Sequence, residues 1–121
     1  MTIEPISRAR LLELLHELSY EERDVILASG AQSSFYLDCR QTALHPEGAA
    51  AIGQHLFELL PKIEARAGVI ASGIGGMSLG ADPLATSVSL TAFGRGRHLP
   101  AFLVRKNAKG HGTGHFVEGR R

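Results

Sequence analysis

The clearest pattern in the chain is a helical spacing of apolar residues. In residues 6–19, leucines recur at intervals of three and four positions, which places them on one face of an amphipathic helix. These are Leu11, Leu14, Leu15 and Leu18. Ser7 precedes the run and is a favourable N-cap residue. The sequence therefore predicts a helix near the start of the chain.

A second helix is predicted over residues 45–63. Pro46 suits the first turn of this helix, and Pro61 is expected to help end it. Its apolar stripe consists of Ile52, Leu56, Leu59 and Leu60. Two helices of this length need other elements to cover their apolar faces.

Shorter apolar runs predict strands. Residues 25–27 and 35–37 flank a turn at Ser29 and Gly30, and this arrangement predicts two short strands that lie between the helices.

The second half of the chain follows a regular order. An apolar run at residues 67–72 predicts a strand, and the glycine-rich residues 73–80 predict a turn. Asp82 and Pro83 are expected to be the cap and first residue of a helix, and residues 99–106 predict another strand. Strand, turn, helix and strand form a βαβ unit, so the fold class is α/β with parallel strands.

Composition limits the class of protein. The chain has 121 residues, 44% hydrophobic and 21% charged, as expected for one globular domain. No apolar run approaches the roughly 20 residues of a membrane span, and the first ten residues lack a secretory pattern. Cys39 is the single cysteine, and we expect it to be a small buried residue in a cytoplasmic protein.

Charge is distributed unevenly along the chain. Residues 1–94 hold six Lys and Arg against eleven Asp and Glu, whereas residues 95–121 hold seven against Glu118 alone. The positive charge is therefore local, unlike the extended basic face of a nucleic-acid-binding protein. A local patch favours a compact anion as the ligand.

The basic segment at residues 105–121 admits several interpretations. Lys109 and His111 are two positions apart between glycines, a pattern that suits a hinged loop closing over a polyphosphate. A basic tail without fixed structure is the alternative. Metal binding by His111 and His115 is disfavoured because their spacing requires a helix. A nucleic-acid arm is disfavoured because Phe116 is the only aromatic residue in the segment.

The remaining motifs are weak by themselves. The glycine-rich turn matches neither the dinucleotide fingerprint nor a phosphate loop that ends in Gly-Lys-Ser/Thr. Asp82 is expected to be a helix cap and not a catalyst, and Asp38 and Arg40 are expected to form a local ion pair. The sequence shows no paired acids for acid–base chemistry and no nucleophile triad.

Three segments together resemble the orotate phosphoribosyltransferase family. They are LASGAQSSFYLDCRQTALHPEG at residues 27–48, GGMSLGADPLATSVSL at residues 75–90 and LPAFLVRKNAKGHGTGHFVEG at residues 99–119. The third is the most specific, because the order Arg-Lys-x-x-Lys-x-His resembles the mobile catalytic loop of that family.

The resemblance implies a type I phosphoribosyltransferase fold, a Rossmann-like parallel sheet with an N-terminal hood of helix and strands. It implies transfer of ribose 5-phosphate from phosphoribosyl pyrophosphate to orotate, which gives orotidine 5′-phosphate and pyrophosphate in pyrimidine and UMP biosynthesis. Mg²⁺ would accompany the pyrophosphate, and no residue of the chain is expected to be a metal ligand. It further implies a cytoplasmic homodimer in which the loop of residues 105–115 reaches the neighbouring site.

The resemblance also implies roles for individual residues. Lys109 and His111 would be catalytic residues of the loop. The residues expected to bind phosphoribosyl pyrophosphate are Arg105, Lys106, Lys109, His111, Gly75 and Gly76. Tyr36 and Leu37 would border the orotate ring.

Two departures from the family pattern stand out. Many members have a lysine directly before the Ser-Gly of the first turn, where this chain has Ala28; Arg40 is a candidate replacement. The apolar strand, paired acids and Thr/Gly-rich loop that bind the 5-phosphate are missing before Arg121. We therefore expect an N-terminal portion of such an enzyme, inactive by itself.

The expected organisation is one partial domain over residues 1–121. Residues 1–45 would form the hood, and residues 46–121 would form the first part of the α/β core with the catalytic loop. Two alternatives remain open: a non-catalytic anion-binding module derived from the family, and a phosphoribosyltransferase for another base.

Overall fold

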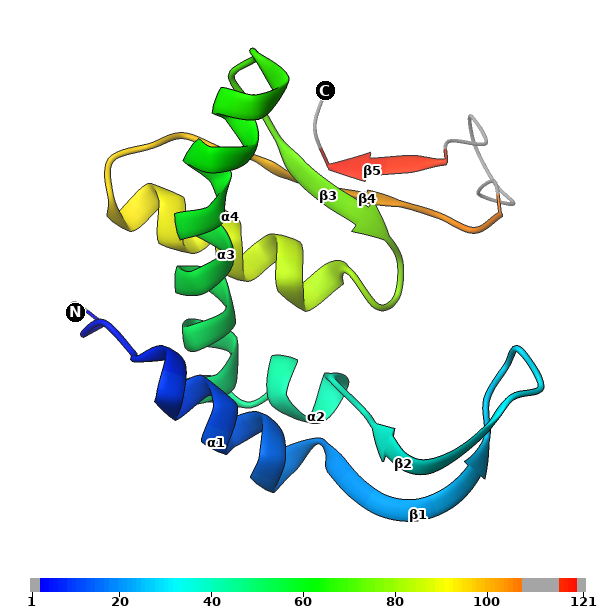
Figure 1. Cartoon of the computed structure of the whole chain (residues 1–121). Helices are drawn as coiled ribbons and strands as arrows, with labels where there is room; N and C mark the ends of the chain where they lie inside the picture. Colours follow the sequence, from blue (N-terminus) through cyan, green and yellow to red (C-terminus); the bar gives the residue numbers. More distant parts are fainter. Residues whose placement is uncertain (1–2, 108–115, 120–121) are drawn as a thin grey trace.

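A three-stranded sheet, a separate β-hairpin and the helices between them make up the computed structural model (Figure 1), which describes residues 3–107 and 116–119. The elements in chain order are α1 (Arg8–Leu18), β1 (Tyr20–Ile26), β2 (Gln32–Leu37), α2 (Arg40–Ala43), α3 (Pro46–Ala67), β3 (Ile74–Met77), α4 (Asp82–Gly94), β4 (Ala101–Val104) and β5 (Val117–Gly119). In the described part of the chain, no helix combines the length and the apolar character needed to cross a membrane.

Helix α1 begins as predicted. The Ser7 side chain accepts a hydrogen bond from the Arg10 main-chain N–H at 3.0 Å, which satisfies one of the free donors at the helix start. The Arg10 guanidinium also makes two bonds of 2.8 Å to Glu47 in the first turn of α3. These bonds lower the pKa of the Glu47 carboxyl and join α1 to α3.

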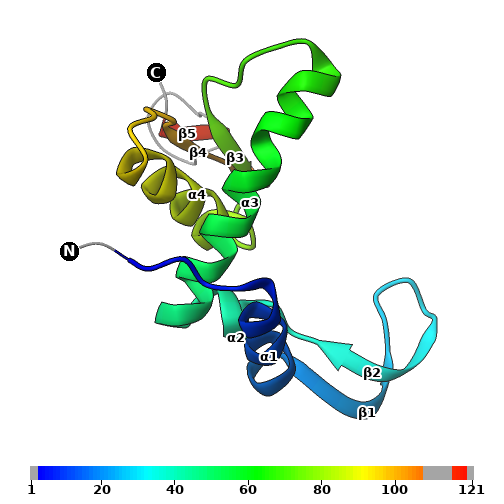
Figure 2. The same ribbon diagram turned by 60° about the vertical axis from the view of Figure 1, so that its left-hand side comes forward.

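The predicted pair of strands is an antiparallel hairpin, although β1 begins earlier than expected, at Tyr20. The hairpin projects from the helices on one side of the molecule (Figures 1 and 2). At its base the Asp38 N–H donates to the Ser19 carbonyl at 2.9 Å. The fully buried hydroxyls of Ser19 and Thr42 lie 2.6 Å apart, so the hairpin is anchored to α2 at this end.

Two details of the second predicted helix are wrong. Pro61 does not end α3, which continues to Ala67 and ends at Gly68, with a φ of 70°. The helix continues because Glu64, only 8% exposed, accepts bonds of 2.6 Å from the Ala71 N–H and from Arg97, which stabilise its last turn. The predicted apolar stripe is also incorrect, since Leu56 and Leu59 are exposed and Leu60 alone of the four is buried.

Helices α3 and α4 cross at a point of small residues. A Cβ added to Gly53 would lie 2.6 Å from the Ser87 carbonyl oxygen and 2.8 Å from the Thr91 hydroxyl. The residues of the buried core beside this crossing are Leu60, Val88, Ala92 and Leu99. The crossing fixes α4, and therefore the turn that leads into α4.

The βαβ unit is confirmed, but its first strand is shifted. Strand β3 spans Ile74–Met77, within the segment predicted to be a turn, and pairs in parallel with β4. Gly75 permits this pairing because a Cβ there would lie 2.4 Å from the Phe102 carbonyl oxygen. Strand β5 adds an antiparallel pair on the other edge of β4, so the described sheet is mixed and not purely parallel.

Candidate anion-binding site

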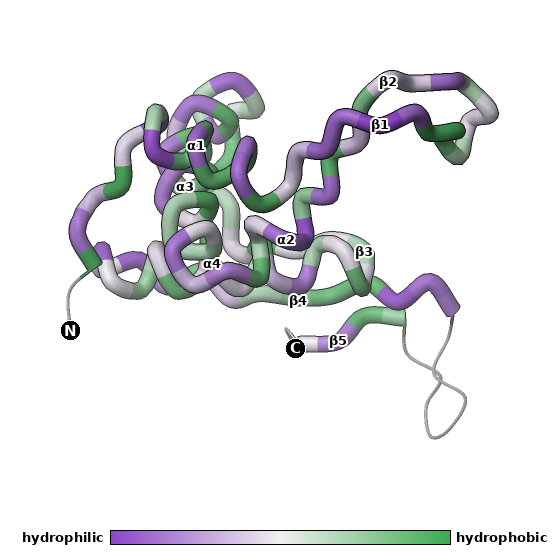
Figure 3. Tube along the Cα trace, turned by 90° about the horizontal axis from the view of Figure 1, so that it is seen from below, coloured by the Kyte–Doolittle hydropathy of each residue, from purple (hydrophilic) through white to green (hydrophobic). Residues whose placement is uncertain are grey.

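Two cations follow β4 directly and line a pocket of about 420 Å³. Arg105 and Lys106 come from the carboxyl end of this strand, and Ser78 and Leu79 come from the turn between β3 and α4. Leu103, Asn107 and Glu118 complete the lining. In Figure 3 the apolar trace of β4 gives way to a hydrophilic segment at this point. The carboxyl end of parallel strands is the usual place for ligands in an α/β sheet.

The turn beside the cations is held by main-chain bonds. The Ser78 N–H donates to the Val104 carbonyl at 2.9 Å, and the Ala81 N–H donates to the Met77 carbonyl at 2.9 Å. The prediction that Asp82 caps α4 is wrong. Asp82 is the first residue of the helix, and the N-cap is Ala81, which makes no side-chain hydrogen bond. The Asp82 carboxylate oxygen Oδ2 instead accepts a hydrogen bond from the Ser78 hydroxyl, with 3.1 Å between the two oxygens.

The charges of the pocket are only partly compensated. Arg105 is bonded to Glu118 at 3.0 Å, and both side chains are about half exposed (40% and 44%). Such a surface pair contributes little and can exchange for a stronger anion. Lys106 is exposed and makes no ion pair with any other described residue. Among the residues that the structure describes, the lining therefore carries two cations against one carboxylate, which favours an anionic ligand.

The structure does not gather all of the predicted site residues. Arg105 and Lys106 line the pocket, whereas Gly75 and Gly76 lie in β3 and outside the lining. Lys109 and His111 lie outside the described residues.

The ends of the predicted loop nevertheless meet at the sheet. The Arg105 N–H donates to the Phe116 carbonyl, and Val104 pairs with Val117. The two described ends of the predicted loop therefore lie next to each other beside the pocket.

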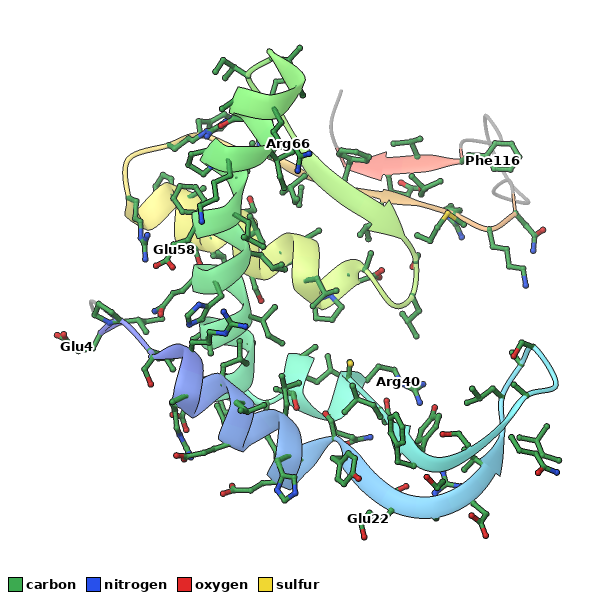
Figure 4. All side chains as sticks on the ribbon, viewed as in Figure 1. Glu4, Glu22, Arg40, Glu58, Arg66 and Phe116 are labelled. Atoms are coloured by element: carbon green, nitrogen blue, oxygen red, sulfur yellow. The ribbon has the colours of Figure 1, made fainter. Side chains whose placement is uncertain are left out.

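The predicted orotate-side residues belong to the hairpin and do not line this pocket. The Arg23 guanidinium lies 5.0 Å from the centre of the Tyr36 ring, and Leu37 is exposed. Arg40 is bonded to Asp38 as predicted, at 2.9 Å, and these bonds lower the pKa of the Asp38 carboxyl. Figure 4 shows Arg40 beside β2, on the side that faces β3 and α4.

Sequence reasoning missed several features of the site. Ser78 and Leu79 lie in the glycine-rich turn that the resemblance placed at the pyrophosphate, but they were not singled out as site residues, and Asn107 gave no signal. Glu118 could have been found as the only acid among residues 95–121. Cys39, predicted to be buried, is exposed.

Two pockets with larger volumes than the candidate site lie elsewhere, but neither is lined by two described cations. One, of about 570 Å³, lies in the hairpin. The other, of about 590 Å³, lies between α3 and α4, and its single cation Arg95 is 3.8 Å from Glu58. We therefore assign the candidate site from charge and position, not from volume.

The described residues do not fit a protein-held magnesium site. Mg²⁺ is usually bound by one or two carboxylates together with substrate phosphates. The described part of the chain contains no cluster of three or more His, Cys, Asp or Glu side chains, and the pocket's carboxylate, Glu118, is already bonded to Arg105. The described residues around the pocket therefore offer Mg²⁺ no set of protein ligands.

Comparison with known proteins identifies the relatives of this arrangement. No protein-family model matches the chain. An orotate phosphoribosyltransferase of Sorangium cellulosum is 50% identical over 117 residues, which cover 94% of this chain and 57% of the relative. One from Nostoc sp. is 45% identical over 112 residues, or 93% of this chain and 51% of the relative. The resemblance to orotate phosphoribosyltransferase is confirmed.

Solved structures agree with the sequence comparison. Mycobacterium tuberculosis H37Rv orotate phosphoribosyltransferase in complex with Fe(III) dicitrate superposes with a TM-score of 0.72 at 39% identity, over 94% of this chain and 60% of that one. The same enzyme in complex with phosphoribosyl pyrophosphate gives a TM-score of 0.66 at 36% identity, over 94% and 57%. The fold is a partial type I phosphoribosyltransferase fold, and the chain spans about half the length of the curated relatives it matches.

Proposed function

We propose that this chain is the N-terminal part of an orotate phosphoribosyltransferase and provides the pyrophosphate side of its active site. The whole enzyme would transfer ribose 5-phosphate from phosphoribosyl pyrophosphate to orotate, with release of pyrophosphate, as a step of pyrimidine biosynthesis. The observation that carries the proposal is the pair of cations, Arg105 and Lys106, opposite the β3–α4 turn. A similar chain, the M. tuberculosis enzyme, binds phosphoribosyl pyrophosphate.

The chemistry explains why cations are needed here. As the bond from the ribose C1′ to the pyrophosphate breaks, negative charge accumulates on the departing oxygens. Fixed positive groups stabilise this charge more in the transition state than in the ground state. Arg105 and Lys106 would hold the pyrophosphate, while Lys109 would close on it with His111 beside it. Contacts from Gly75 and Gly76 remain predictions.

Other parts of the proposal concern the rest of the site. Tyr36 and Leu37 would border the orotate ring from the hairpin, with Arg40 supplying the charge that Ala28 lacks. Arg40 is suited to this because its side chain is 63% exposed, so a ligand can reach the guanidinium beside Asp38. Mg²⁺ would accompany the pyrophosphate, bound by the substrate's own oxygens.

The proposal also includes the assembly. The enzyme would be a cytoplasmic homodimer in which the loop of residues 105–115 reaches the neighbouring site. Residues 1–45 would form the hood and residues 46–121 the first part of the core. The 121 residues alone are expected to show negligible turnover, because the relatives have about twice this length.

A chimera tests the activity. Residues 3–119 would replace the matching part of the M. tuberculosis enzyme, and formation of orotidine 5′-phosphate would be followed by absorbance. We expect turnover with orotate, and we expect Lys106→Ala to lower kcat/KM by about 100-fold, as for loss of a group that stabilises transition-state charge.

The outcomes separate the alternatives. An inactive chimera, combined with pyrophosphate binding by the 121-residue chain, would favour a non-catalytic anion-binding module. Preference for another base in a competition assay would favour a different phosphoribosyltransferase. Activity that Lys106→Ala leaves unchanged would contradict the assigned site.

A further inference from the structure

The Asp82 carboxylate does more than place a negative charge in the first turn of α4, where the helix dipole favours it. It is the first residue of α4, yet α4 has no side-chain cap. Its carboxylate turns back toward the preceding turn, where Oδ2 lies 3.1 Å from the Ser78 hydroxyl oxygen. Its other oxygen, Oδ1, is buried and has no hydrogen-bond partner among the described residues. An unpaired carboxylate oxygen is costly to bury, so its presence here calls for a reason.

The direction of the hydrogen bond follows from chemistry. An ionised carboxylate can only accept, so the Ser78 hydroxyl donates its single proton to Asp82. The hydroxyl therefore has no proton left to donate to an anion in the pocket. Ser78 contributes to the pocket through its position and main chain, and not as a hydrogen-bond donor to the ligand.

The bond also gives the turn a second anchor. The Ser78 N–H is bonded to the Val104 carbonyl, directly before Arg105. The Ser78 side chain is bonded to α4 through Asp82. One residue thus links the strand that carries the two cations to the helix on the other side of the turn.

We propose that Asp82 is a positioning residue that holds the β3–α4 turn against Arg105 and Lys106, so that the turn and the cations face one anion together. The inference rests on the proposed function, because it concerns how the same pocket receives pyrophosphate. Asp82 itself does not contact the anion: its bonded oxygen points to Ser78 and its other oxygen is buried.

Three variants separate this role from simple loss of charge or stability. Asp82→Ala removes the acceptor, whereas Asp82→Asn keeps an acceptor oxygen and removes the charge. Thr86→Ala is a matched control, because it removes the 2.8 Å bond from the Thr86 hydroxyl to the Asp82 carbonyl and leaves Ser78 untouched. All would be made in the full 121-residue chain, with folding checked by circular dichroism.

Pyrophosphate binding by isothermal titration is the first measurement. We expect Asp82→Ala to raise the Kd about tenfold, equivalent to the loss of one hydrogen bond to a charged group. Asp82→Asn and Thr86→Ala should remain within about threefold of the wild-type chain. Ser78→Ala in the Asp82→Ala background should add nothing, because the two residues act through one bond.

Amide hydrogen exchange is the second measurement and does not depend on pyrophosphate. The bonded N–H groups of Ser78 and Ala81 should exchange faster in Asp82→Ala and at the wild-type rate in Asp82→Asn. Equal exchange in wild type and Asp82→Ala would overturn the inference, as would an Asn variant that behaves like Ala. If the wild-type chain by itself does not bind pyrophosphate, hydrogen exchange alone decides the role of Asp82, while the chimera still decides the proposed function.

Discussion

The crossing of α3 and α4 makes a sharp prediction about stability. Gly53→Ala adds a methyl group where the Ser87 carbonyl oxygen would be 2.6 Å away and the Thr91 hydroxyl 2.8 Å away. Neither the main chain of α4 nor a β-branched side chain can move aside easily. Alanine normally stabilises a helix interior by about 1 kcal/mol relative to glycine, but overpacking costs about 1–3 kcal/mol. Because backbone is involved, we take the upper end and expect a net loss of about 2 kcal/mol.

The same substitution elsewhere provides the control. Gly94 is the last residue of α4, and a Cβ added there would have no neighbour within 4 Å. Gly94→Ala should therefore increase stability, by about 0.5 kcal/mol at a helix end. Urea unfolding followed by circular dichroism at 222 nm measures both variants, and the m values should be unchanged. If Gly53→Ala is as stable as Gly94→Ala, the close approach of the two helices is wrong.

Three further predictions concern single side chains. His45→Ala should cost about 1 kcal/mol, because the ring nitrogen that accepts from the Gly48 N–H at the start of α3 is lost, and His45→Asn should retain the cap in urea unfolding. Hydrogen bonds from Arg97 and Ala71 hold the pKa of the Glu64 carboxyl below its ordinary 4.5 in the folded chain. The stabilisation of the fold by ionised Glu64 should therefore be complete above about pH 4.5 and be lost as the pH falls through the lower pKa of the folded state. Glu64→Gln should flatten that part of a profile of unfolding free energy against pH. Glu118→Gln should lower the Kd for pyrophosphate about threefold, because it releases the Arg105 guanidinium from its surface ion pair with Glu118. An unchanged Kd would show that this ion pair does not compete with the ligand.

Local patterns in the sequence predicted most elements but not their exact ends. Ser7 and the leucine spacing were sufficient for α1, because capping and amphipathicity are local properties. Pro61 was misleading because tertiary bonds to Glu64 sustain the helix beyond it, and such bonds leave no mark in the neighbouring sequence. Strand β5 was missed since three residues give too short a pattern to detect.

The sequence predicted only part of the candidate site. Arg105 and Lys106 were identified through the resemblance to orotate phosphoribosyltransferase, whereas the local excess of positive charge by itself indicated only a compact anion as the ligand. Gly75 suggested a turn, since its lack of a side chain fits either a turn or a close strand contact, and only the partner Phe102 distinguishes them. The link from Ser78 to Asp82 could not be predicted, because it depends on the direction in which the chain turns before α4.

The central position of β4, between β3 and β5, has a consequence for the order in which parts of the chain unfold. Its main chain is hydrogen-bonded on both edges, to β3 and to β5. Within residues 3–107 and 116–119, the hairpin strands β1 and β2 pair only with each other. Local unfolding begins where few bonds and little buried surface must be given up, so the hairpin should open in low denaturant while β4 is still protected. The two sides of the proposed site would then belong to separate cooperative units. The base-facing side could adjust to different ring shapes without disturbing the cations that hold the pyrophosphate.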